Sequence, residues 1–321
     1  MLNAAQLALF AFGDDKVELL PHDTAGTPEG AATAAQVAIG DGARIILGPL
    51  LAGSVQAVAP AARAANVPVV AFSSDRTVAG YGVYVMGFLP SAEADRVVRH
   101  AINKGRKRFG ILAPNTPYGA TVVEAVQAAA VSAGAVVTKI RRYDPASDDF
   151  TAVVRDVADY TVRHQALLHQ RTELKAKDDE ASKRALERLA SLQSIGDLPF
   201  DALMVADGGK RLQEIAALLP FFDVDPGIVQ IIGTGQWDVA GLGAEPALVN
   251  ALYAAPDPAA RRDFSKQFKD TYGEDAPRLA TLAYDAMALA AVLARGEQGP
   301  DFSAASLTSA SGFFGRDGIF R

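Results

Sequence analysis

Short runs of β-branched and aliphatic residues alternate along this chain with longer, alanine-rich segments of helical periodicity. Such alternation predicts parallel strands joined by crossover helices, which cover both faces of the sheet. The first part of the chain offers strands at 17–20, 44–47, 67–72 and 83–86, with helices at 27–39 and 53–65.

The alternation starts again near Leu89-Pro90-Ser91, and the chain ends in a helical tail. The second block offers helices at 91–104, 118–132 and 209–222, strands at 109–113, 135–141, 201–205, 228–232 and 252–255, and tail helices at 259–272, 278–295 and 303–309. At about 150 residues per domain, 321 residues suit two domains. We therefore expect an α/β fold of two doubly wound parallel-sheet lobes with a hinged cleft between them. Lobe one is expected at 1–90 plus 256–311, and lobe two at 91–255 plus 312–321.

One segment, 160–195, interrupts this alternation because it is rich in charged residues. It contains opposite charges four residues apart, such as Glu173 with Lys177 and Glu180 with Arg184, which is typical of exposed helices. Two interpretations stay open. The segment is either a solvated helical excursion or a protruding element that contacts a partner.

Composition excludes several classes of protein. The formal net charge of −6 is unsuited to a nucleic-acid-binding face, which needs clustered cations. The absence of cysteine excludes disulfides, thiolate metal sites and cysteine nucleophiles. The least polar stretch, 276–294, contains Arg278 and Asp285 and is too interrupted to span a bilayer. The start of the chain carries no basic leader segment, although one could precede it.

No catalytic constellation is evident. His164 and His169 are five residues apart, a spacing that splays them on a helix and disfavours a metal pair. There is no Gly-x-Ser-x-Gly elbow, and Gly208-Gly209-Lys210 lacks the remaining residues of a phosphate loop. We therefore expect no enzyme activity, no metal and no cofactor.

Small polar residues follow the ends of several predicted strands. In open parallel sheets, ligands bind outside the carboxyl ends of the strands, where helix N-termini present free N–H groups. Each residue alone is also explained as a helix cap or turn residue. Taken together they predict a ligand-binding cleft lined by Ala52, Gly53, Ser54, Ser73, Ser74, Asp75, Tyr118, Asp207, Gln236 and Trp237. Within it, Asp207 is the candidate to hold a cationic group, and the Tyr118 ring could cover an aliphatic ligand.

Several motifs make the chain resemble a known family. Gly48-Pro49, Val67-Pro68-Val69-Val70 and Ser73-Ser74 resemble the first lobe of type I periplasmic binding proteins of the leucine-binding branch, and Pro117-Tyr118-Gly119 and Asp149-Phe150-Thr151 resemble the second. More narrowly, the segments 219–224 and 233–238, together with the charged excursion, resemble the penicillin-binding-protein activators.

The resemblance implies a non-catalytic, monomeric, extracytoplasmic protein that binds a small molecule, such as an amino acid, in the interlobe cleft. On the activator reading, it regulates peptidoglycan synthesis by contacting a peptidoglycan synthase. Alternatively, it is the receptor of a branched-chain-type amino-acid ABC importer and contacts the permease. The resemblance also implies a periplasmic location and leaves open a lipid anchor upstream.

Three departures from the family pattern affect these expectations. The family begins with a strand, whereas this chain opens on a helix, and the family continues past Arg321 with another hairpin. Amino-acid receptors of the family hold the ligand ammonium with an acidic residue where this chain has Gly235. Binding of an amino acid would therefore need Asp207 or Asp238 as a substitute.

Overall fold

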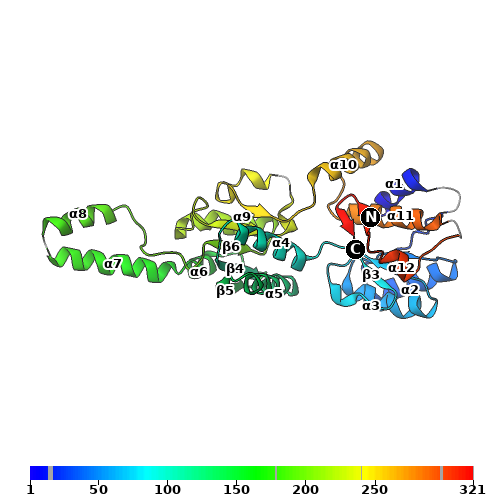
Figure 1. The fold of residues 1–321 in the computed structure, drawn as a ribbon, viewed down its shortest axis with the longest axis horizontal. Helices are drawn as coiled ribbons and strands as arrows, with labels where there is room; N and C mark the ends of the chain where they lie inside the picture. The colour runs from blue at the N-terminus through cyan, green and yellow to red at the C-terminus, as the bar shows by residue number, and fades with distance from the viewer. Residues whose placement is uncertain (14–16, 178, 240, 297–298, 321) are drawn as a thin grey trace. The chain divides into compact units, whose positions relative to one another are not determined.

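The computed structural model describes residues 1–13, 17–177, 179–239, 241–296 and 299–320. The chain forms two compact units, shown in Figure 1. Unit 1 comprises Met1–Leu89 and Pro256–Arg321, and unit 2 comprises Pro90–Ala255. Unit 2 is therefore continuous in sequence, and it is inserted into the chain of unit 1.

Unit 1 contains a parallel three-stranded sheet in the order β1-β2-β3. Its elements are α1 (Leu2–Phe12), α2 (Pro28–Gly40), β1 (Ile46–Leu47), α3 (Ala52–Ala64), β2 (Val69–Ala71), a 3-10 turn η1 (Arg76–Val78), β3 (Val83–Val85), α10 (Pro258–Tyr272), α11 (Ala280–Ala294), α12 (Ala304–Leu307), β9 (Phe313–Gly315) and β10 (Gly318–Phe320). Val70 packs in a cluster with α1, α10 and α11, whereas Val69 and Ala71 pack with α2 and α3. Both faces of the sheet are thus covered, as the apolar run of β2 predicts.

The predicted strand at 17–20 is not formed. Val17 and Leu19 do pack against the core cluster around α11, so the apolar pattern correctly indicated burial. The segment nevertheless has no place in the hydrogen-bonded ladder of the sheet. Burial of alternate side chains is therefore achieved here by an extended segment without strand pairing.

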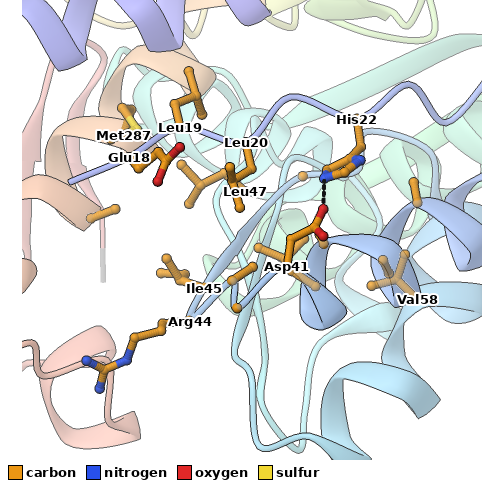
Figure 2. Close-up of a pocket in the computed structure, with 18 of the residues that line it drawn as sticks. Glu18, Leu19, Leu20, His22, Asp41, Arg44, Ile45, Leu47, Val58 and Met287 are labelled. Atoms are coloured by element: carbon orange, nitrogen blue, oxygen red, sulfur yellow. Dashed lines mark ion pairs between the residues drawn. The ribbon is translucent and has the colours of Figure 1, made fainter.

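A cavity of about 370 Å³ lies in unit 1 along this segment. β1 pairs with β2 in the sheet. The residues 44–49, which include β1, line the cavity. Figure 2 shows side chains of the lining, among them Leu19, Leu47 and Met287. His22 and Asp41 lie at its rim, with Nε2 and Oδ2 3.9 Å apart. The lining is largely apolar and contains none of the predicted site residues.

The C-terminal residues 312–321 were expected in lobe two, and this expectation was wrong. Strands β9 and β10 form an antiparallel hairpin within unit 1. Phe313 and Phe320 pack against the core cluster of α11, and the backbone N–H of Arg316 donates to both carboxylate oxygens of Asp285 at 2.8 and 2.9 Å. Apolar packing and this buried carboxylate hold the hairpin on unit 1.

Unit 2 contains a parallel five-stranded sheet in the order β5-β4-β6-β7-β8. The chain moves outward from β4 to β5 and then returns to β6, so the winding reverses between β4 and β6. Its elements are α4 (Pro90–Asn103), β4 (Arg108–Pro114), α5 (Pro117–Ser132), β5 (Val136–Tyr143), α6 (Thr151–Val157), α7 (Tyr160–Lys177), α8 (Glu180–Leu189), β6 (Ala202–Val205), α9 (Gly209–Leu218), β7 (Gln230–Gly233) and β8 (Leu252–Tyr253), with 3-10 turns η2 (Leu219–Phe222), η3 (Gly235–Trp237), η4 (Leu242–Ala244) and η5 (Pro246–Leu248). Doubly wound sheets bind ligands where the winding reverses, beyond the carboxyl ends of the strands.

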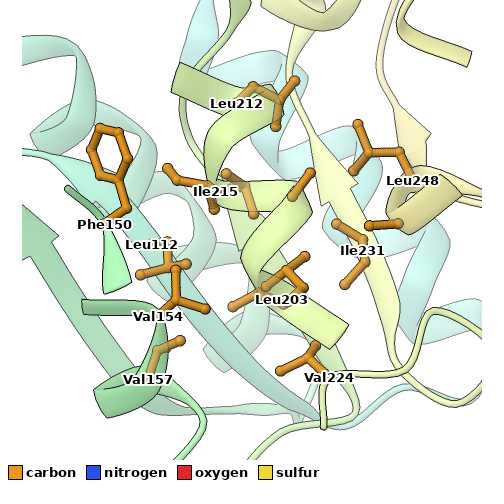
Figure 3. Close-up of a cluster of buried hydrophobic side chains, with 14 of the residues drawn as sticks. Leu112, Phe150, Val154, Val157, Leu203, Leu212, Ile215, Val224, Ile231 and Leu248 are labelled. Atoms are coloured by element: carbon orange, nitrogen blue, oxygen red, sulfur yellow. The ribbon is translucent and has the colours of Figure 1, made fainter. Parts of the chain in front are cut away.

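The unit 2 sheet is buried on both faces. Figure 3 shows one face, where Leu112, Leu203 and Ile231 of the sheet pack against α6 and α9. The alternate residues Phe109 and Ile111 pack on the opposite face with residues of α4 and α5. The two clusters fix the strands tightly and so determine where the loops at their carboxyl ends lie. These observations establish the α/β, parallel-sheet fold class predicted from the sequence.

The charged excursion forms a helical hairpin of α7 and α8, which extends away from the sheet of unit 2 in Figure 1. In α7, Leu167 is the buried residue, and most other side chains are exposed. The Arg171 guanidinium donates to the carbonyl oxygens of Ala190 and Leu192 at 3.2 and 3.1 Å and so ties α7 to the end of α8. The hairpin is therefore held together mainly by its own contacts.

Candidate functional site

The predicted site residues fall into two groups, one at the strand ends of each unit. The unit 1 strand-end surface comprises Ala52, Gly53, Ser54, Ser73, Ser74 and Asp75. On the unit 2 strand-end surface, the predicted Tyr118, Asp207, Gln236 and Trp237 are joined by residues that were not predicted: Glu93, Tyr143, Thr234 and Gly235. Each unit is described by itself, and the predicted convergence of both sets on one cleft stays a prediction.

On unit 1, Ser54 lies in the first turn of α3, just after β1. The helix begins after Leu51, whose side chain has no group that could cap the first N–H groups. Ser54 is only 2% exposed, and its hydroxyl has no hydrogen-bond partner within the described part of the chain. Buried hydroxyls are normally paired, so this one is available to an added partner. A helix N-terminus together with a hydroxyl donor suits an anion.

The loop after β2 is organised by its own hydrogen bonds. The Ser73 hydroxyl is buried and accepts from the Asp75 N–H at 3.1 Å. Asp75 Oδ1 in turn accepts from the N–H and the hydroxyl of Thr77 at 2.8 and 2.7 Å, which caps η1. Asp75 is thus a capping residue, while the neighbouring Ser74 is exposed.

On unit 2, Asp207 follows β6 as predicted, but its carboxylate is fully engaged. Oδ1 accepts from the Gly208 N–H at 2.8 Å and from Arg211 at 3.0 Å, and Oδ2 accepts from Arg211 at 2.8 Å and from the Tyr143 hydroxyl at 2.7 Å. A carboxylate has about four acceptor positions, so all of them are used. The expectation that Asp207 receives a ligand ammonium therefore finds no support in its geometry. The hydrogen bonds between the two side chains, together with the negative charge of Asp207, raise the pKa of Arg211.

Tyr118 lies at the start of α5, directly after β4, and is half-buried. Its hydroxyl is 2.6 Å from Thr234 Oγ1, which follows β7. Burial is the main reason that the pKa of Tyr118 is raised, and the nearby carboxylates of Glu93 and Asp207 raise it further. Tyr118 is therefore a neutral hydroxyl at the carboxyl edge of the sheet, and its contact with a ligand stays a prediction.

The predicted role of Trp237 as a ligand-facing aromatic is corrected by its position. The side chain is 1% exposed and belongs to the core cluster of β6 and α9. Its indole N–H donates to the backbone oxygen of Asp207 at 2.8 Å, and its ring fills the space above Gly233. Trp237 thus fixes the loops after β6 and β7, whereas the adjacent Gln236 is exposed.

Sequence reasoning missed Glu93, Tyr143, Arg211 and Thr234. Glu93 lies in the first turn of α4, and one of its oxygens accepts from the Gly235 N–H at 3.0 Å. The predicted site residues all follow strands, whereas Glu93 lies in the first turn of a helix. The sequence did contain a signal, because the alternation of strands and helices starts again at Pro90 with the helix that carries Glu93, α4. The first turn of α4 lies at the carboxyl edge of the sheet, where Glu93 contacts Gly235.

No group of three or more metal-binding side chains is found among the residues that the structure describes. In the same part of the chain, no helix is long and apolar enough to cross a bilayer.

Comparison with known proteins supplies further findings. Residues 1–311 match the family model described as "Periplasmic binding protein". A search of curated protein sequences gave no match.

Solved structures with a similar fold cover nearly the whole chain. An ABC transporter substrate-binding protein from Sphaerobacter thermophilus is 18% identical, with a TM-score of 0.70, and the match covers 100% of this chain and 83% of that one. The branched-chain amino acid transporter substrate-binding protein LivJ from Streptococcus pneumoniae, in complex with isoleucine, is 16% identical (TM-score 0.60; 99% and 85% covered). An ABC transporter solute-binding protein from R. palustris, in complex with 4-hydroxybenzoate, is 14% identical (TM-score 0.62; 99% and 82% covered). At these identities the likeness shows the fold.

Proposed function

Because the chain belongs to the periplasmic binding protein family, we propose that it is the extracytoplasmic solute-binding receptor of an ABC importer. Proteins of similar fold serve ABC transporters and bind small molecules that include isoleucine and 4-hydroxybenzoate. The family consists of non-catalytic proteins, and the chain accordingly has a binding role in this proposal.

The observation that carries the proposal is the buried, unpartnered hydroxyl of Ser54 at the start of α3. A solute carboxylate would accept from this hydroxyl and from the first N–H groups of the helix. Isoleucine and 4-hydroxybenzoate both carry a carboxylate, so an anion site at α3 fits either class of solute. The engaged carboxylate of Asp75, which lies in the same unit as Ser54, organises the loop after β2.

Native mass spectrometry of the purified protein, followed by calorimetric titration with amino acids and benzoates, tests the proposal. A retained or titrating carboxylate solute is the expected result. Ser54→Ala should weaken its binding about tenfold or more, because a hydrogen bond to a charged group contributes about 1.5–3 kcal/mol. Ser191→Ala, an exposed serine of unit 2, is the matched control. Equal affinity of both variants would contradict the role of Ser54, and a protein that binds no solute would contradict the proposal.

A second candidate function is regulation of a peptidoglycan synthase by direct contact. The supporting observation is the hairpin of α7 and α8, whose exposed, charged helices a solute site does not need. Replacing residues 166–191 with a short Gly/Ser linker should abolish binding to a purified synthase if this function holds. Unchanged binding, or none by the intact protein, would reject it. A lipid anchor and a monomeric state stay predictions.

A further inference from the structure

Within the described part of the chain, the apolar strand β1 pairs with β2 alone. The N–H groups of Ile46 and Gly48 donate to carbonyl oxygens on the β2 side at 2.9 and 2.8 Å. The backbone groups of the alternate residues, Ile45 and Leu47, point away from β2, and no described backbone hydrogen bond joins them to residues 17–24. Both side chains are half-buried, whereas every residue of β2 is buried. An apolar edge of this kind is a template for pairing with a further strand.

The cavity of about 370 Å³ beside β1 lies between the helices that cover the two faces of the sheet. Ala31 of α2 lines it from the face on which Val69 packs, and Met287 of α11 lines it from the face on which Val70 packs. The extended segment 17–20 also lines it, as Figure 2 shows. Protein interiors hold few voids larger than a water molecule. A space of this size at the level of the sheet has the lining that a strand buried on both faces requires.

The helices beside the cavity indicate which part of the polypeptide fits it. α2 connects residues 17–20 to β1, α3 connects β1 to β2, and both helices pack on the same face of the sheet. α1, which precedes residues 17–20, packs on the opposite face with α11. Right-handed crossovers place helices on opposite faces when the chain moves along the sheet in opposite directions. A strand that leads into α1 therefore lies on the β1 side of residues 17–20, at the position of the cavity.

The orientation of α1 agrees with this placement. Arg295, directly after α11, donates to the carbonyl oxygen of Phe12 at the end of α1, so the two packed helices end together. At the other end of α11, the Arg278 guanidinium lies 4.0 Å from the centre of the Phe88 ring, which follows β3. α1 therefore begins near the carboxyl edge of the sheet, where a helix that follows a parallel strand begins.

We infer that the cavity beside β1 is the binding slot for one further parallel strand, and that its occupant is an extended, apolar segment of polypeptide leading into α1. This strand pairs with the free backbone groups of Ile45 and Leu47 and buries its side chains against α2 and α11. Its pairing closes the apolar edge of the unit 1 sheet. The inference is independent of the proposed function.

Amide hydrogen exchange, followed by NMR, tests the inference on the chain with two extensions before Met1. The first carries lysines for solubility, a strand of about six valine and isoleucine residues and a short Gly/Ser linker. The control has proline at alternate strand positions, where it cannot donate to a ladder. The strand extension should slow exchange at Ile45 and Leu47 by about tenfold or more, and the proline control should leave it unchanged. Equal exchange in the two proteins would overturn the inference.

Two variants of the extended chain test the place of the strand. Ala35→Phe puts a ring into the lining of the slot and should cancel the added protection, whereas Gln36→Phe, on the exposed side of α2, should keep it. Protection that survives Ala35→Phe would overturn the proposed position.

Two added molecules test the occupant on the unextended chain. The free strand peptide at equimolar concentration should protect Ile45 and Leu47 far less than the fused strand, because a short linker supplies a millimolar effective concentration. Equal protection would overturn the assignment to a segment that leads into α1. Dodecanoate, an apolar chain without amide groups, should protect neither residue. Protection by dodecanoate equal to that of the fused strand would identify a lipid pocket and overturn the inference.

Discussion

The carboxyl group of Asp285 offers a quantitative test of how the C-terminal hairpin is held. Asp285 is 1% exposed in α11, and its oxygens accept from the Arg316 N–H at the tip of the β9–β10 hairpin. The pKa of Asp285 is raised from 3.8 to about 6, mainly by burial and in part by the neighbouring Asp317 charge, and the hydrogen bond from the Arg316 N–H only partly opposes this rise. Gly315 passes so close that a Cβ there would lie 2.4 Å from Asp285 Oδ2.

The direction in which pH changes the unfolding free energy depends on how many protons the folded and unfolded states bind. Between pH 3.8 and about 6, Asp285 is protonated in the folded chain and ionised in the unfolded chain. The unfolded state therefore binds fewer protons, so stability falls as pH rises through this window. The difference between the two pKa values corresponds to a total change of about 3 kcal/mol in the unfolding free energy. About 2 kcal/mol of this loss of stability occurs between pH 4 and pH 7.

Asp285→Asn removes this titration and keeps an oxygen that can accept from Arg316. We expect the unfolding free energy of the wild type, relative to the variant, to fall by about 2 kcal/mol from pH 4 to pH 7. Urea unfolding followed by circular dichroism reports both units. The fluorescence of Trp237, the single tryptophan, reports unit 2 and serves as the internal control. Parallel pH profiles of the two proteins, or a wild type that gains relative stability as pH rises, would refute the reasoning.

Three further predictions concern unit 2, with urea unfolding followed by Trp237 fluorescence as the measurement. Asp207→Ala should cost about 1–3 kcal/mol because it leaves the buried hydroxyl of Tyr143 without its acceptor, and an unchanged midpoint would contradict that network. Gly110→Ala should cost about 1–3 kcal/mol, because its Cβ would lie 2.4 Å from the buried ring of Phe200; no loss would mean that the ring moves freely. Replacing residues 166–191 with a short linker should leave the midpoint nearly unchanged, since the hairpin is held mainly by its own contacts, and a large loss would show that it supports the sheet.

Much of the fold was predictable because strands buried on both faces have a continuous apolar sequence. The strands β2, β4, β6 and β7 were expected for that reason, as were the helices between them. The segment 17–20 is also mostly apolar, apart from Glu18. Strand formation, however, requires a neighbouring strand with free backbone N–H and C=O groups, and the composition of a segment does not show whether one is present. The hairpin at the C-terminus was misplaced because its two short strands bind unit 1 through side chains of α11.

The site was predictable only in part, for a different physical reason. Chain position showed that Ser54, Tyr118 and Asp207 follow strands, and the structure has them there. What a strand-end residue contacts depends on residues far along the chain. Asp207 is bound by Tyr143, and Glu93 meets Gly235 across 142 positions. Such pairings leave no local signal, so the engaged state of Asp207 and the location of Glu93 needed the structure.

The insertion of unit 2 within unit 1 has a consequence for synthesis of the protein. Residues 90–255 hold all the strands of the unit 2 sheet, so that unit can fold as soon as they emerge from the ribosome. The first 89 residues must wait for α11, which ends at Ala294 and supplies much of their core. About 200 residues separate the two segments, a delay of roughly 10 to 40 seconds at about 5–20 residues per second. During that interval Val70, Phe72 and the apolar face of α1 lack their partner, so the nascent N-terminal segment is the part of the chain that most needs a chaperone.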